Sequence, residues 1–307
     1  MAFKRIIRAL LRPVFNIVFV RLFPLWEAMG FHLTLNQYHQ PIPDTRTLKP
    51  ELWLRQSELV GVDINEQNQI QFLSQISSRF KDEYNSFPKN EAQQSYHYYI
   101  NNGWFQSVDG EILYCMVRHF KPKKIIEIGS GYSTYLSAQA ILKNEQENGY
   151  KGELIAIDPY PNEVVKSGFP GLSKLIPIKV EEINLSMYNE LKENDILFID
   201  TSHVLRIGGD VQYEYLEILP RLNKGVIVHI HDIFLPMEYP KKWVLEMHRF
   251  WNEQYLLQAF LAFNNAFEIL WAGYYMHLKH PEKLKKAFSS YDRMTTWPQS
   301  FWIRRNL

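Results

Sequence analysis

The sequence contains a single cysteine, Cys115, so no disulfide bond can form within the chain. It also lacks any run of the roughly 18–20 apolar residues that a membrane-spanning helix requires. Its 34 basic residues almost match its 33 acidic residues. This balance gives no sign of the basic face that binds nucleic acid, so we expect no nucleic-acid partner. The lone cysteine is consistent with a reducing, cytoplasmic location.

Hydrophobic residues make up 46% of the 307 residues, which is enough for a large core. Apolar residues at three- and four-residue spacing from Ile70 to Phe80 predict a helix, and Leu52 and Leu59, seven residues apart, suggest another. Residues 111–120 predict a further helix. We therefore expect three parts in the chain. These are an N-terminal appendage (1–50), a helical cap region (51–120) and an α/β domain (121–307).

The first residues of the chain combine basic and apolar side chains. The apolar run from Val14 to Val20 is too short to span a bilayer, and Arg21 follows it. No small-residue cleavage site follows the run, which argues against a secretory signal. Two roles stay open, an amphipathic helix on a membrane surface or a helix packed on its own domain or on a second subunit of a homo-oligomer. The basic residues before the run are Lys4, Arg5, Arg8 and Arg12.

From residue 124 the sequence alternates between short apolar runs and helical segments. The runs are almost continuously apolar, which is typical of parallel strands buried on both faces of a sheet. Joined by helices, they predict an α/β fold with a Rossmann-like sheet. We expect Asp210 to cap the N-terminus of one helix and Gly225 to end that helix. The predicted strands are 124–128, 154–158, 176–180, 196–200, 226–232, 267–271 and 301–303, and the predicted helices begin near 133 or span about 210–222 and 246–263.

The first predicted strand leads into a glycine turn that has an acidic residue before it. Glu127 stands two residues before Gly129-Ser130-Gly131, and Thr134 occupies the place of the third glycine of a dinucleotide-binding turn. The carboxylate of Glu127 would repel a pyrophosphate and attract a cation. We therefore expect S-adenosylmethionine as cofactor, because it carries an ammonium group and a sulfonium but no phosphate.

A second acid supports this cofactor. Asp158 ends the second predicted strand, where a carboxylate can accept hydrogen bonds from both ribose hydroxyls. Glu181 follows the third predicted strand, and we expect it near the adenine edge of the cofactor. The alternative is that it lies in a solvated loop. The predicted cofactor-binding residues are Glu127, Gly129, Ser130, Gly131, Ser133, Thr134, Asp158 and Glu181.

Two acids and two histidines follow the fourth and fifth predicted strands. Asp200 and His231-Asp232 end these strands, and His203 follows Asp200 by three residues. Since ligands of open α/β sheets lie beyond the carboxyl ends of the strands, we expect these side chains to meet. Asp200, His231 and Asp232 are the predicted ligands of a divalent metal that lowers the pKa of a substrate hydroxyl, with His203 or His231 as catalytic base. A metal-free reaction and a purely structural role stay open, and either His229 or His231 can be a core histidine.

With these residues the chain resembles the class I S-adenosylmethionine-dependent methyltransferases over roughly residues 100–275. The stretches 198–204 and 229–236 are similar to a bacterial subgroup of small-molecule and sugar O-methyltransferases. The resemblance implies a seven-stranded, mostly parallel sheet with an antiparallel last strand. It also implies that acids ending strands four and five hold magnesium. His231 departs from that pattern, because those families have an oxygen ligand at this place. Histidine is a poorer ligand for magnesium and a better one for manganese, iron or zinc.

We therefore predict an S-adenosylmethionine-dependent O-methyltransferase that acts on a hydroxyl of a sugar or secondary metabolite with the help of a divalent metal (Mg, Mn or Fe). Its expected partner is a small molecule. One alternative is a metal-dependent hydroxylase-like enzyme on the same fold, similar to the cephalosporin-hydroxylase branch. The other is a non-catalytic cofactor-binding or membrane-associated protein. The expected location is cytoplasmic, with peripheral membrane contact through the N-terminal helix left open.

Overall fold

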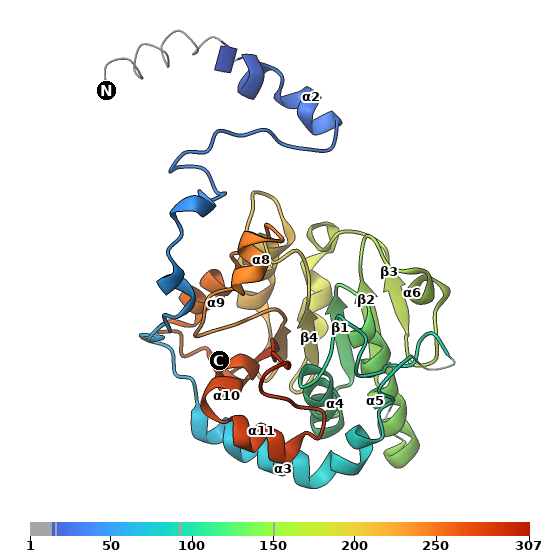
Figure 1. The fold of residues 1–307 in the computed structure, drawn as a ribbon. Helices are drawn as coiled ribbons and strands as arrows, with labels where there is room; N and C mark the ends of the chain where they lie inside the picture. Colours follow the sequence, from blue (N-terminus) through green and yellow to red (C-terminus); the bar gives the residue numbers. More distant parts are fainter. Residues whose placement is uncertain (1–13, 16, 92–93, 150) are drawn as a thin grey trace. The chain divides into compact units, whose positions relative to one another are not determined.

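The computed structural model describes residues 14–15, 17–91, 94–149 and 151–307 (Figure 1). The chain divides into two compact units. The first comprises Met1–Leu52 and Lys242–Phe250, and the second comprises Trp53–Lys241 and Trp251–Leu307. The basic residues Lys4, Arg5, Arg8 and Arg12 lie outside the described residues.

The first unit contains short helical segments and no buried side chain among its described residues up to Leu52. No helix of the described part of the chain is long and apolar enough to cross a membrane. The segments are η1 (Ile17–Arg21), α2 (Phe23–Ala28) and η2 (Thr45–Thr47), with η3 (Pro50–Trp53) and α8 (Lys241–Leu245) at the boundaries between the units.

The second unit is built around a seven-stranded sheet in the order β3-β2-β1-β4-β5-β7-β6. The first five strands in chain order pair in parallel, and β7 pairs antiparallel with both β5 and β6. This topology confirms the predicted Rossmann-like sheet with an antiparallel last strand. The strands are β1 (Lys124–Ile128), β2 (Glu153–Ile157), β3 (Lys174–Ile176), β4 (Ile196–Ile199), β5 (Ile227–Ile230), β6 (Phe267–Ala272) and β7 (Phe301–Arg305).

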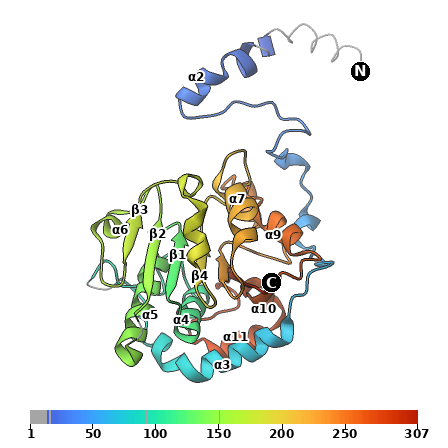
Figure 2. The ribbon, with the colours of Figure 1, turned by 180° about the vertical axis from the view of Figure 1, so that it is seen from behind.

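Helices cover both faces of this sheet (Figure 2). The helices α3 (Glu66–Asn85), α4 (Asp109–Phe120), α5 (Tyr132–Asn148), α10 (Gly273–Lys279) and α11 (Pro281–Ala287) belong to one face. The other face carries α7 (Asp210–Tyr213), η6 (Glu214–Ile218), η7 (Leu219–Arg221), η5 (Leu185–Glu190) and α9 (Glu253–Leu261). The remaining segments are α6 (Glu163–Ser167) and η4 (Val180–Glu182).

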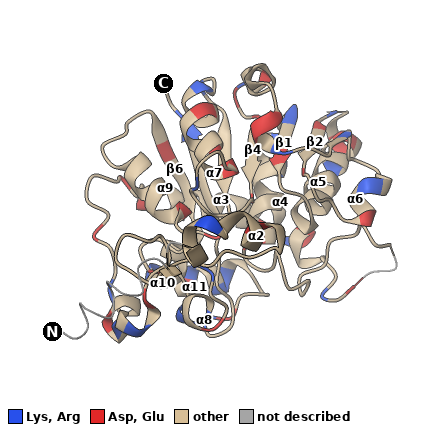
Figure 3. Cartoon of the chain, turned by 90° about the horizontal axis from the view of Figure 1, so that it is seen from above, with Lys and Arg blue, Asp and Glu red and all other residues tan. Residues whose placement is uncertain are grey.

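Two separate apolar cores follow from the alternation of side chains along each strand. In β1, Ile125 packs into the core that contains α4 and α5, whereas Ile126 and Ile128 pack into the core that contains η6 and α9. Burial of both faces explains why the central strands are almost continuously apolar. Acidic and basic side chains are interspersed on the surrounding helices (Figure 3), as on α6, where Lys166 pairs with Glu163 at 2.7 Å.

Several predicted boundaries were wrong, each for a local reason. The third strand covers Lys174–Ile176 and not 176–180, because Pro177 cannot continue the ladder. Leu59 lies outside any helix with a left-handed φ of 51°. Residues 86–91 and 94–108 form no helix or strand, and α9 begins only at Glu253, after a turn that bonds back to His203.

Two capping predictions were also wrong. Gly209, and not Asp210, is the N-cap of α7, and the Asp210 carboxylate instead accepts hydrogen bonds from the Ser202 backbone N–H (2.8 Å) and hydroxyl (2.7 Å). Gly225 lies beyond the helical run, which ends at Arg221, and its backbone N–H donates to the Arg305 carbonyl at 2.7 Å. Asp210 therefore shapes the loop after β4.

Candidate active site

The turn between β1 and α5 approaches the end of β4 very closely. Gly129 has a left-handed φ of 85°, and a Cβ added there would lie 1.9 Å from the backbone oxygen of Asp200. The Gly129 N–H donates to the Ile157 carbonyl of β2 at 2.9 Å. Only glycine therefore allows this turn to lie against its neighbours, and the turn links the ends of three strands.

The same turn leads into α5, whose first turn contains a capping hydrogen bond to a side chain. The Gly131 N–H donates to Oγ1 of Thr134 at 2.9 Å, so Thr134 serves as a cap where a dinucleotide-binding turn has glycine. A Cβ added to Gly131 would meet no atom within 4 Å, because open space lies beside this residue. The hydroxyl of Ser133 donates to Oε1 of Glu127 at 2.5 Å. These contacts join the acidic residue of β1 to the first turn of the helix.

Glu127 is fully buried behind the glycine turn. Burial raises the pKa of its carboxyl to about 8, although the hydrogen bond from Ser133 acts in the opposite direction. Its second oxygen, Oε2, has no hydrogen-bond partner among the described residues. A cation near this carboxyl would therefore both satisfy the oxygen and favour its ionised form.

Asp158 follows β2 and is held by the glycine turn. Its Oδ2 accepts from the Ser130 backbone N–H (3.1 Å) and hydroxyl (2.6 Å), and its Oδ1 accepts from the Tyr160 N–H at 2.7 Å. The structure therefore brings Asp158 to the predicted cofactor residues. Glu181 is half-buried in η4, and its side chain makes no hydrogen bond or ion pair with another described residue, so its place near the adenine stays a prediction.

Three potential metal ligands converge where β4 and β5 end. Asp200, His231 and Asp232 each offer an atom within 4.8 Å of the others. Nδ1 of His231 lies 3.8 Å from Oδ2 of Asp200 and 3.5 Å from Oδ1 of Asp232. We call these three residues the carboxylate–histidine rim. They are the same three residues that the sequence pattern placed together.

His203 lies against this rim from the loop after β4. Its Nε2 is 3.3 Å from Oδ1 of Asp200 and 3.2 Å from Oδ2 of Asp232. Its Nδ1 pairs with Oε2 of Glu253 at 2.9 Å, and the ring contacts that of Trp251 at 4.4 Å. His203 and Asp232 both have left-handed φ angles, 58° and 57°. Backbone strain of this kind is typical of functional sites.

The charges of the rim reinforce one another. Burial alone would raise the pKa of Asp200, but His231 and His203 lower it well below its ordinary value. Burial would lower the pKa of both histidines, but the neighbouring carboxylates outweigh it and raise the pKa of His231 to about 9 and that of His203 well above its usual range. Without a bound cation, protonated imidazoles therefore compensate the negative charge of the rim.

His229 is the core histidine of the pair on β5. Its ring stacks on Phe198 at 3.8 Å, and its Nε2 lies 3.0 Å from the hydroxyl of Ser300. Burial lowers its pKa well below the ordinary value, so this imidazole is neutral. His229 therefore contributes packing, and His231 contributes to the rim.

Two buried acids near the rim were not predicted as site residues. Oδ2 of Asp109, the first residue of α4, lies 3.6 Å from Nε2 of His231, and its carboxylate accepts backbone N–H bonds from Gln299 and Ser300. Glu253 is 1% exposed and pairs with His203. The sequence indicated only that Asp109 lies in a segment that could fold over the strand ends and that Glu253 belongs to a polar–aromatic cluster that could face the cleft.

Comparison with known proteins agrees with this arrangement. Residues 126–233 match the family model described as "Methyltransferase domain". An uncharacterised protein of Archaeoglobus fulgidus is 30% identical over 166 residues, which cover 52% of this chain and 73% of the relative. The range matched by the family model runs from β1 through the carboxylate–histidine rim. The chain belongs to the class I S-adenosylmethionine-dependent methyltransferases.

Solved structures similar to this methyltransferase include the apo structure of CmcI, with 14% identity, a TM-score of 0.38, and coverage of 74% of this chain and 84% of that chain. Another is the apo structure of CalS11, TDP-rhamnose 3'-O-methyltransferase, with 12% identity, a TM-score of 0.40, and coverage of 79% and 95%. These similarities are too low to assign a substrate.

The residues of the glycine turn fit the methyltransferase cofactor. The space beside Gly131 leaves room for a ligand against the backbone, and the unpartnered oxygen of Glu127 suits a cationic one. The rim fits a divalent metal by its donor set of two carboxylates and one imidazole, which together favour manganese, iron or zinc over magnesium.

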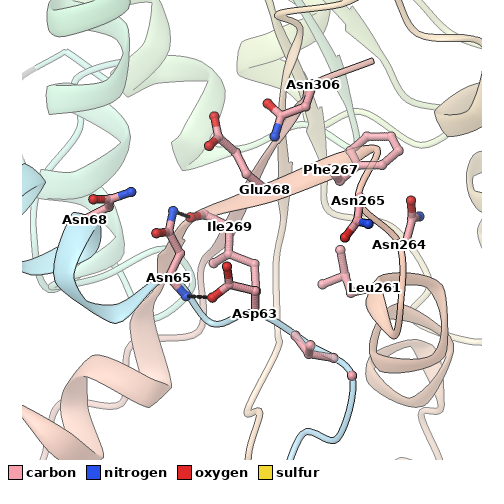
Figure 4. Close-up of a pocket in the computed structure, with 12 residues that line it drawn as sticks. Asp63, Asn65, Asn68, Leu261, Asn264, Asn265, Phe267, Glu268, Ile269 and Asn306 are labelled. Atoms are coloured by element: carbon pink, nitrogen blue, oxygen red, sulfur yellow. Dashed lines mark hydrogen bonds between the residues drawn. The ribbon is translucent and has the colours of Figure 1, made fainter.

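The second unit also contains a polar pocket of about 250 Å³ away from the rim (Figure 4). Phe267, which begins β6, and Asn306, which follows β7, line it. Phe267 pairs with Arg305, and Arg304 pairs with Ile227, the first residue of β5. The pocket therefore lies at the amino ends of the parallel strands, opposite the rim, and it contains none of the predicted site residues.

Proposed function

We propose that this methyltransferase transfers a methyl group from S-adenosylmethionine to a hydroxyl oxygen of a small molecule, a saccharide or a secondary metabolite, with a divalent metal at the rim. The observation that carries the proposal is the convergence of Asp200, His231 and Asp232 within 4.8 Å at the carboxyl ends of β4 and β5. The turn that holds Gly129 touches Asp200 directly, so a cofactor at the turn and an acceptor at the rim would be neighbours.

The cofactor would lie against the β1–α5 turn. When bound, S-adenosylmethionine supplies an electrophilic methyl group on a positively charged sulfur. Glu127 provides the negative charge that favours a cationic ligand, and Asp158 offers carboxylate oxygens at the end of β2 for the ribose. Gly131 leaves space for the ligand, and Ser133 and Thr134 keep the turn in place. Glu181, in η4 after β3, is the residue that we propose for the adenine edge.

The acceptor would be activated at the rim. Asp200, His231 and Asp232 would hold the metal, which when bound lowers the pKa of a coordinated hydroxyl. The positive charge of a metal at the rim would favour the neutral imidazole of His203, which would then accept the hydroxyl proton at Nε2, because Nδ1 is held by Glu253. The protein contributes alignment of acceptor and methyl group, and no covalent intermediate with the chain is required.

Metal binding provides the test, because it needs no knowledge of the acceptor. Metal-free protein is titrated with Mn²⁺, Mg²⁺ and Zn²⁺ by calorimetry, and with Fe²⁺ under anaerobic conditions. We expect Mn²⁺ to bind with a Kd below about 100 μM, and Mg²⁺ more weakly. Asp82→Asn, an isosteric change on the exposed face of α3, is the control and should bind as the wild type does. Absence of saturable binding for every ion would contradict a metal-assisted reaction.

A second assay separates methyl transfer from the hydroxylase alternative. Radiolabelled S-adenosylmethionine is incubated with panels of saccharides and phenols, with Mn²⁺ and without oxygen. Label transfer under these conditions would support the proposal. In a parallel incubation with Fe²⁺ and oxygen, oxygen consumption that requires Fe²⁺, with no label transfer in either incubation, would favour the iron-dependent enzyme.

The charge of Glu127 makes a separate prediction about pH. Since the carboxyl has a pKa of about 8 without cofactor, it must lose a proton to face a cationic ligand at lower pH. Affinity for S-adenosylmethionine should therefore rise with pH up to about 8, by up to about tenfold per unit. Glu127→Gln should bind at least about tenfold more weakly at pH 8 and should lose this part of the pH dependence. Calorimetry from about pH 6 to about pH 9 measures both proteins. Identical pH profiles for the wild type and Glu127→Gln would show that the charge of Glu127 does not contribute to cofactor binding.

A further inference from the structure

The segment from residue 14 to residue 33 exposes apolar side chains along its whole length. Val20 is 63% exposed and Met29 is 60% exposed, and no described residue of the segment is buried. Soluble monomers rarely leave so continuous an apolar surface uncovered. The exposed large apolar residues of the segment are Val14, Ile17, Val20, Leu25, Met29, Phe31 and Leu33.

The segment nevertheless has a local structure of its own. Nε1 of Trp26 donates to the Val18 carbonyl at 2.7 Å, and the Trp26 ring stacks on Phe31 with centroids 5.6 Å apart. The Leu22 N–H donates to the Ile17 carbonyl at 2.9 Å, which joins η1 to the start of α2. These helical pieces of five and six residues are far shorter than the roughly 20 residues needed to cross a bilayer, so the segment suits an interface and not the bilayer interior.

The net charge of the N-terminal segment distinguishes between the possible partners of this surface. Residues 1–33 contain five basic residues and one acidic residue, Glu27. Subtraction from the totals of 34 and 33 leaves 29 basic and 32 acidic residues in the rest of the chain. A second copy of the segment would bring like charges together. An anionic lipid surface would complement them, and each basic side chain near such a surface increases affinity about fivefold.

We propose that residues 14–33, with the basic residues that precede them in the sequence, dock the protein on an anionic lipid surface. The apolar side chains insert at the level of the headgroups, and Trp26 lies in the interfacial layer where tryptophan is favoured. The methyltransferase then works at a membrane surface. This attachment is independent of the metal and of the acceptor.

The test uses the full-length protein and vesicle flotation. Vesicles of phosphatidylcholine with about one third phosphatidylglycerol are compared with vesicles of phosphatidylcholine alone. We expect at least tenfold tighter binding to the anionic vesicles, and weaker binding in high salt. Val20→Glu with Leu25→Glu should reduce binding at least tenfold and leave the melting temperature unchanged, since neither side chain is buried. Met294→Glu changes an 81% exposed apolar residue elsewhere in the chain and should bind as the wild type does.

Three outcomes would overturn the proposal. The first is no binding to anionic vesicles. The second is binding that Val20→Glu with Leu25→Glu does not reduce. The third is a dimer in light scattering that dissociates in this variant, without vesicle binding, which would assign the surface to a second copy. None of these outcomes affects metal or cofactor binding, so the proposed function is tested separately.

Discussion

Asp200→Asn is expected to abolish tight metal binding while S-adenosylmethionine binds almost as in the wild type. The side chain of Asp200 offers one of the three converging ligand atoms, whereas its contact with the cofactor turn is made by its backbone oxygen. The substitution removes the charge and keeps the shape. We expect Mn²⁺ affinity to fall at least about 100-fold, as does methyl transfer to any acceptor found, and cofactor affinity to change less than about threefold.

The two histidines of the rim give this experiment a second readout. Asp200 is a main cause of the raised pKa of His231, and it also raises that of His203. Its neutralisation should therefore lower both pKa values, which nuclear magnetic resonance of the imidazole protons can follow. Asp82→Asn should change none of these quantities. If cofactor and metal affinity fell together in Asp200→Asn, the residue would be part of the cofactor site or would support the fold. The proposal that its side chain serves the metal and not the cofactor would then be wrong.

The strands were predicted well because burial dictates their sequence. Ile125, Ile126 and Ile128 of β1 are all buried, so an apolar run of the right length had one plausible structure. The prediction failed where a single residue interrupts such a run, as Pro177 does after β3. It also failed for α9, because the turn before Glu253 is fixed by hydrogen bonds to a loop some 50 residues away in the sequence.

The rim was predictable for a reason that does not depend on loops. The carboxyl ends of adjacent parallel strands meet at one edge of the sheet, so residues ending β4 and β5 must be neighbours. Asp109 and Glu253 approach the histidines from segments outside these strands, and nothing in the sequence fixes that approach. The choice between His229 and His231 also required the structure, because alternation places both on the same face of the sheet.

Gly129→Ala is expected to destabilise the fold strongly. The new Cβ would lie 1.9 Å from a backbone oxygen, which no side-chain rotation can relieve, at a φ of 85° that disfavours any residue with a Cβ. We estimate a loss of about 3 kcal/mol in the free energy of unfolding, from a clash that the backbone relieves only in part. At about 2–4 °C per kcal/mol, this lowers the melting temperature by roughly 6–12 °C in a thermal scan.

Gly131→Ala provides the matched control, because the same substitution two residues away meets open space. Its Cβ would find no atom within 4 Å, and its φ of 172° is extended backbone, so the melting temperature should stay within about 2 °C of the wild type. If the open space belongs to the cofactor, the added methyl group should instead reduce S-adenosylmethionine affinity at least about tenfold. Normal cofactor binding in Gly131→Ala would place the ligand elsewhere. Equal destabilisation of the two variants would show that the turn is not in close contact with Asp200. The proposed link between the cofactor turn and the metal rim would then be wrong.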